Sequence, residues 1–111
     1  MTKYHKGRRF EYKIKGLLQE KGLVVLRTAG SHGFADLIVL SGRGVYFLQL
    51  SEVYSAKKEI ELMHFVRDYS YLDGAVFFVY KRGKDIEASQ IFVFGLRRYS
   101  LEEFISILKA G

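Results

Sequence analysis

The chain of 111 residues contains no cysteine, no proline and no tryptophan. The absence of cysteine excludes both a disulfide framework and a cysteine zinc site. Its apolar runs fall well short of the roughly 18 residues that a membrane-spanning helix needs, and its basic N-terminal region lacks the apolar stretch of a secretory signal. We therefore expect one domain over residues 1–111, cytoplasmic and without membrane contact.

Positive charge is distributed unevenly along the chain. The formal net charge is +6, and residues 1–35 hold eight lysines and arginines but only two acidic residues. In the remaining residues, ten basic side chains balance ten acidic ones. A basic segment of this density attracts polyanions, so it predicts a nucleic-acid partner. A solvated helix face is the alternative interpretation.

A β-hairpin is predicted around residues 41–44. Runs of β-branched and aromatic residues flank this segment, Ser41-Gly42-Arg43-Gly44, on both sides. Glycine adopts the backbone conformations that a tight reversal needs, and the flanking runs have strand composition. A four-residue loop pairs Leu40 with Val45.

Three polar side chains are predicted to converge on one face of this hairpin. Counting outward from the turn places Asp36 opposite Gln49, and Ser51 follows on the same face because side chains alternate with period two. Directly opposite residues lie about 5 Å apart at Cβ. That separation allows Asp36 and Gln49 to share one divalent cation.

The chain resembles the archaeal Holliday junction resolvases of the PD-(D/E)XK nuclease superfamily over residues 6 to about 95. Residues 6–11 (KGRRFE) are similar to the opening of that family, residues 27–33 (RTAGSHG) to its glycine-serine loop, and residues 35–38 (ADLI) to its first acidic motif. The next family motif, Glu-x-Lys, falls on residues 49–51, where this chain has Gln-Leu-Ser.

The fold implied by this resemblance is α/β, a restriction endonuclease-like core with a central mixed β-sheet flanked by helices. The hydrophobic periodicity gives the order α-β-β-β-α-β-β-α. Ile60 is expected to face the core from the second helix, and Phe94 from the last strand. Outside the hairpin, the predicted helices are residues 7–21, 55–71 and a last helix from Ser100, and the predicted strands are residues 23–27, 75–80 and 91–94.

The resemblance implies a degenerate catalytic site made of Glu11, Asp36, Gln49 and Ser51. In active relatives, carboxylates hold Mg²⁺, which activates water and stabilises the leaving oxygen while a lysine supports the nucleophile. The first three residues are the implied metal positions. Glutamine removes a negative charge and serine removes a cation, so we expect metal binding to be weak or lost, with Mg²⁺ needed only if activity remains. For Glu11 the alternative is a helical ion pair with Lys15.

DNA contacts are predicted for the basic cluster, for the glycine-serine loop and for two lysines that follow the hairpin. The loop is suited to a phosphate because it combines backbone N–H groups with a hydroxyl. The residues are Lys6, Arg8, Arg9, Arg27, Ser31, His32, Lys57 and Lys58.

We interpret the chain as a DNA-binding protein with a Holliday junction resolvase-like nuclease fold, catalytically impaired or inactive, that forms a homodimer. One alternative is an active metal-dependent endonuclease that cleaves branched DNA. The other is a non-catalytic subunit or adaptor that uses the fold for protein-protein contacts, with its apolar strands and last helix as the interface. The interpretation leaves four-way junctions, other branched DNA, duplexes and RNA open as substrates.

Overall fold

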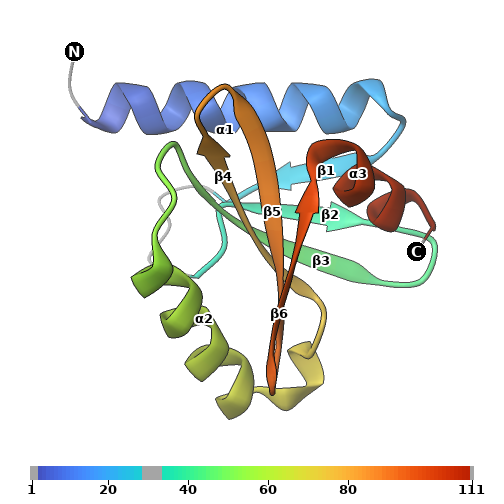
Figure 1. The fold of residues 1–111 in the computed structure, drawn as a ribbon. Coiled ribbons are helices and arrows are strands. Elements are labelled where there is room, and N and C mark those ends of the chain that lie inside the picture. Colours follow the sequence, from blue (N-terminus) through green and yellow to red (C-terminus); the bar gives the residue numbers. More distant parts are fainter. Residues whose placement is uncertain (1–2, 29–33, 111) are drawn as a thin grey trace.

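The computed structural model describes residues 3–28 and 34–110, and over this part of the chain three α-helices flank a six-stranded sheet (Figure 1). The strands lie in the sheet in their order along the chain, and only β3 and β4 run parallel. The expected α/β class with a mixed sheet is confirmed. The elements are α1 (Lys3–Glu20), β1 (Val24–Arg27), β2 (Leu37–Leu40), β3 (Val45–Ser51), α2 (Ala56–Asp68), a 3-10 turn (Ser70–Leu72), β4 (Val76–Arg82), β5 (Asp85–Phe92), β6 (Gly95–Ser100) and α3 (Leu101–Ala110).

The sheet is covered on both faces. Helices α1 and α3 pack against one face and share a core cluster with it, whereas α2 packs against the other face through Leu62 and Val66. Strand β4 is buried on both sides, so Phe77 contributes to the first cluster and Phe78 to the second. This alternation explains why β4 is a nearly continuous apolar run. None of the described helices is long and apolar enough to cross a membrane.

The helix ends follow the sequence signals. Gly22, with φ of +87°, follows α1 in the left-handed conformation that glycine adopts at little cost. Ser55 caps α2, and its Oγ accepts a hydrogen bond from the Lys58 backbone N (3.1 Å). At the start of α3, which begins after Ser100 as predicted, Ser100 and Glu103 form a capping box through bonds of 2.9 and 3.2 Å.

The sequence prediction missed one strand. Residues 91–94 are not a strand of their own, because β5 ends at Phe92 and β6 begins at Gly95. Phe94 is 98% exposed in the turn between them, so its predicted core position is wrong. Polar side chains interrupt the apolar pattern of β5, and Ser89 among them is fully buried through side-chain hydrogen bonds that the pattern does not reveal.

Helix α2 is rotated relative to the prediction. Ile60 is 51% exposed, and the buried stripe is instead Glu59, Leu62 and Val66. Apolar spacing alone excludes a glutamate from a buried face and therefore favours Ile60 at this position. The rotation is possible because the Glu59 carboxylate finds hydrogen-bonding partners beneath the helix.

Candidate functional site

Asp36 lies one residue before β2 and is held against β3. The ladder pairs Leu40 with Val45, as predicted, and ends at Leu37 opposite Leu48. One residue further, the Asp36 Oδ2 accepts hydrogen bonds from Gln49 Nε2 (3.1 Å) and from the Leu50 backbone N (2.8 Å). The structure therefore brings Asp36 and Gln49 together.

Glu11 pairs with a strand rather than with its own helix. Arg27 Nε donates to Glu11 Oε2 at 2.7 Å, so the alternative pairing with Lys15 is not the one observed. This bond is the main cause that raises the pKa of Arg27. The Arg27 guanidinium also lies 5.5 Å from the centre of the exposed Tyr12 ring. Arg27 thereby ties α1 to the end of β1.

The electrostatic environment of Asp36 is unfavourable to its charge. Burial is the largest influence and raises the pKa of Asp36, whereas the Leu50 N–H lowers it. The charge of Glu11 raises this pKa further, and that of Lys58 lowers it, with a net increase. A carboxylate whose charge is incompletely compensated is typical of a functional position.

Ser51 does not complete this site. Its Oγ donates to the Val53 carbonyl (2.7 Å) and accepts from the Val53 backbone N (3.2 Å). The hydroxyl is therefore engaged in the loop that leads to α2. Strand β3 (Val45–Ser51) contains no lysine or arginine, so it brings no cationic side chain to this position.

The described side chains do not fit a magnesium ion as they stand. Within residues 3–28 and 34–110, no three histidine or acidic side chains are grouped so as to hold a metal. Arg27 occupies one oxygen of Glu11, and the Gln49 amide presents its NH₂ group, a donor, to Asp36. Mg²⁺ requires several oxygen ligands in near-octahedral geometry, and this arrangement does not supply them.

The predicted DNA contacts are spread over several elements. Arg9 is exposed on α1, Arg8 is half-buried there, and Lys57 is exposed in the first turn of α2. Lys58 Nζ lies 3.3 Å from Glu61 Oε2. The backbone of Lys6 belongs to α1, whereas Ser31 and His32 lie outside the described residues.

A buried carboxylate cluster was missed by the sequence analysis. Glu59 is 3% exposed and accepts hydrogen bonds from Ser89 Oγ (2.6 Å), Arg98 Nη2 (2.9 Å) and the Tyr54 hydroxyl (2.5 Å). Burial alone would raise the pKa of Glu59, but the bonds from Arg98, Ser89 and Tyr54 outweigh it and lower the pKa. We call Glu59, Ser89, Arg98 and Tyr54 the Glu59 cluster. The sequence signal for this cluster is a glutamate at helical spacing from Leu62 and Val66, which places it on the same face of α2.

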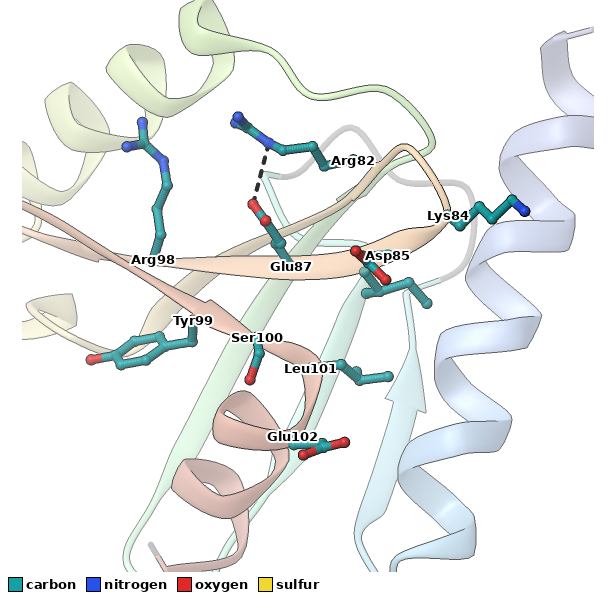
Figure 2. A pocket seen from close by; sticks show the side chains of 10 residues that line it. Arg82, Lys84, Asp85, Glu87, Arg98, Tyr99, Ser100, Leu101 and Glu102 are labelled. Atoms are coloured by element: carbon teal, nitrogen blue, oxygen red, sulfur yellow. Dashed lines mark ion pairs between the residues drawn. The ribbon is translucent and has the colours of Figure 1, made fainter.

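A pocket of about 700 Å³ opens between the β4–β5 hairpin, β6 and the start of α3 (Figure 2). Its charged lining mixes Arg82, Lys84 and Arg98 with Asp85, Glu87 and Glu102. In Figure 2, Arg82 and Glu87 face each other as an ion pair of 3.3 Å, while Glu102 belongs to α3. None of the residues that line this pocket is a predicted site residue, so the pocket is distinct from the Asp36 site.

Comparison with known proteins supports the fold. The chain matches the structure of Archaeoglobus fulgidus Hjc, a Holliday junction resolvase from an archaeal hyperthermophile, with a TM-score of 0.51 and 20% sequence identity. The match covers 87% of this chain and 85% of that one. No family model and no curated protein matches the sequence. The chain therefore has a resolvase-like, restriction endonuclease-like fold.

The Glu59 cluster generates a stability prediction. Glu59→Ala leaves Arg98 and Ser89 without their shared acceptor, and removing one partner of a buried ion pair costs about 3–5 kcal/mol. Because the Arg98 side chain is 48% exposed, we expect a loss near the lower end of that range. Urea unfolding measures it, with Glu61→Ala, an exposed acid of the same helix, as the control. An equal effect of both substitutions would contradict the cluster's role.

The Glu59 cluster also makes the free energy of unfolding depend on pH. The folded-state pKa of Glu59 is below its ordinary value, so its contribution is present above the unfolded-state pKa and is lost as pH falls through the folded-state pKa. The free energy of unfolding of the wild type should therefore fall more steeply in acid than that of Glu59→Gln.

Proposed function

We propose that this protein binds DNA through its resolvase-like fold and cleaves it poorly or not at all. The observation that carries the proposal is the contact between Gln49 and Asp36: an amide donor faces the carboxylate where relatives place a second carboxylate. Metal-assisted hydrolysis depends on a strong negative field that holds the ion. The neutral Gln49 weakens this field, and Ser51 supplies no charge.

The basic face of α1 supports DNA as the partner. Arg9 and Lys13 are both exposed and lie four residues apart, so they project from the same side of the helix. Lysine and arginine that neutralise phosphates release condensed counterions, which makes such binding strong at low salt and independent of sequence. The similarity to Hjc extends the proposal to branched DNA, including four-way junctions.

A homodimer is part of this proposal. Val24, Leu40 and Val45 are adjacent in the sheet register, and with Leu26 they form a half-exposed apolar face. They point to the side of the sheet on which α2 packs mainly against β4 and β5. By contrast, Phe104 and Leu108 of α3 are buried within the protein. A second copy of the chain covers this face with a matching apolar surface and presents two DNA sites to a two-fold symmetric junction.

The homodimer is tested by sedimentation equilibrium. Leu40→Lys places a charge at the centre of the apolar face and should increase the dimer dissociation constant at least tenfold, which corresponds to about 1.4 kcal/mol. Arg43→Glu, in the exposed turn beside it, serves as the charge control. A monomeric wild type, or a dimer unaffected by Leu40→Lys, would refute this interface.

DNA binding is tested by fluorescence anisotropy over a salt series. Arg9→Ala with Lys13→Ala removes two phosphate contacts, so the slope of log affinity against log salt should decrease by about 2. The matched control, Arg43→Ala with Lys109→Ala, removes the same charge from exposed positions on other elements. Equal losses in both double variants would show that net charge, rather than α1, determines binding.

Catalytic impairment is tested on junction DNA with Mg²⁺ or Mn²⁺. The wild type should give no more than trace cleavage, and Gln49→Glu with Ser51→Lys should increase Mn²⁺ binding in calorimetry because it restores a carboxylate and a cation beside Asp36. Restored cleavage requires placement within about 0.5 Å, so it is expected to be partial. Rapid wild-type turnover that Asp36→Ala abolishes would contradict the proposal.

A further inference from the structure

Arg82, the last residue of β4, is held in place from two sides. Its Nε lies 3.3 Å from Glu87 Oε1 on the neighbouring strand. Its guanidinium carbon lies 4.4 Å from the centre of the Tyr54 ring and 5.9 Å from the centre of the Tyr80 ring. A guanidinium that is already held by aromatic rings and by an ion pair loses less conformational freedom when it binds a ligand. Arg82 is therefore oriented before any ligand arrives.

The groups that hold Arg82 are themselves fixed by buried contacts. Tyr80 is fully buried, and its hydroxyl donates to Glu87 Oε1 at 3.1 Å. The Tyr54 hydroxyl donates to Glu59 at 2.5 Å. The Glu59 cluster, which joins α2 to the sheet, thereby also fixes the ring beside which the Arg82 guanidinium lies.

The terminal nitrogens of Arg82 remain available to a ligand. A guanidinium carries five N–H donors, and only the Nε of Arg82 faces Glu87. Across residues 3–28 and 34–110, no hydrogen bond occupies its Nη1 or Nη2. The side chain is 52% exposed, so a ligand can approach it. The Nη1–Nη2 edge can therefore bind a phosphate through two parallel hydrogen bonds.

Arg82 lines the pocket of Figure 2 at the end of the sheet that is next to α1. The two residues that follow it, Gly83 and Lys84, form the turn between β4 and β5, in which Gly83 has φ of +65°. Ile86, just after this turn, shares a core cluster with Phe10 of α1, and both pictures show the turn beside that helix (Figure 1, Figure 2). Arg82 is therefore close to the helix to which we assign DNA binding.

The charges of this pocket favour a single phosphate group over a dense run of phosphates. Its lining holds three bases and three acids, so it offers no strongly positive surface. Among the bases, Arg98 is already paired with Glu59 at 2.9 Å. Lys84 takes part in no ion pair within the part of the chain that the structure describes. Arg82 is thus the base that is both oriented and still able to bind an anion.

We propose that Arg82 binds one backbone phosphate of DNA through its Nη1–Nη2 edge, and that the β4–β5 turn is a second DNA contact beside α1. This inference rests on the proposed DNA binding. Lys84, next to it in the turn, adds only general charge. The geometry of the guanidinium, and not its charge alone, is what makes this contact.

The first test uses inorganic phosphate and no DNA. The arginine Nε–Hε signals are followed by NMR while phosphate, or acetate at equal ionic strength, is added. The Arg82 signal should shift and saturate with phosphate, and the signal of Arg97, exposed on β6, should not. If the two arginines respond alike, or if neither responds, the phosphate site is overturned. A stronger response to acetate than to phosphate would also contradict it, because the edge would then prefer a carboxylate.

The second test compares the DNA affinities of Arg82 variants by anisotropy. Arg82→Lys keeps the charge but loses the planar edge, so it should weaken binding about threefold or more with little change in the salt slope. Arg82→Ala should weaken binding further and lower the slope by about 1. The matched controls, Arg97→Lys and Arg97→Ala, should bind like the wild type. Wild-type affinity in Arg82→Lys, or equal losses in the two alanine variants, would overturn the proposed contact.

The two tests separate failure of this inference from failure of the proposed function. If the wild type does not bind DNA at low salt, the proposed function and the DNA contact of Arg82 both fail, while the phosphate titration still decides whether the Arg82 edge binds an anion. If DNA binds and Arg82→Lys binds as the wild type does, DNA binding stands and only the role of Arg82 is refuted.

Discussion

The register of the β2–β3 hairpin determines which side chains the candidate site contains. Leu40 pairs with Val45 across the turn, and every later pair follows from that first one until Asp36 reaches Gln49. A shift of one residue would move Asp36 to the opposite face of the sheet, against α1. The same register continues through β4 and β5, where it aligns Ser89 with the row of Gln49. The turn at residues 41–44 therefore positions the Asp36 site, whereas the pairings of β3 with β4 and of β4 with β5 position the anchor of α2.

Asp36 is half-buried and Glu59 is buried, and their surroundings shift the two pKa values in opposite directions. Glu59 has an arginine and two hydroxyl donors, and its pKa is lowered despite burial. Asp36 has two N–H donors but a second carboxylate nearby, and its pKa is raised. Glu59 thus stabilises the fold in its charged form, whereas the charge of Asp36 is retained against the stability of the fold. This difference separates Glu59, whose charge the fold stabilises, from Asp36, the acid to which we assign the functional role in our proposal.

The sequence predicted those features that depend on neighbouring residues. The hairpin follows from two glycines in a four-residue turn, the end of α1 from Gly22, and the start of α3 from a serine and a glutamate three residues apart. The features that it did not predict join residues distant in the chain. Glu11 meets Arg27 sixteen positions away, and Glu59 meets Arg98 thirty-nine positions away. Periodicity excludes a glutamate from a buried stripe unless a partner is known, and only the fold brings Arg98 to Glu59.

Replacement of a metal-binding carboxylate by an amide changes the chemistry of a site without disturbing its architecture. Gln49 occupies the volume of a glutamate, and its NH₂ group bonds Asp36 at 3.1 Å. The pair is thereby satisfied without an ion, whereas two carboxylates at this distance would repel each other unless a cation separated them. Ser51, two residues further along the strand, takes no part in this pair and instead closes the following loop through Val53. Gln49 thus gives Asp36 a hydrogen-bond donor but no positive charge, so the Asp36 charge is only partly compensated and its pKa stays raised.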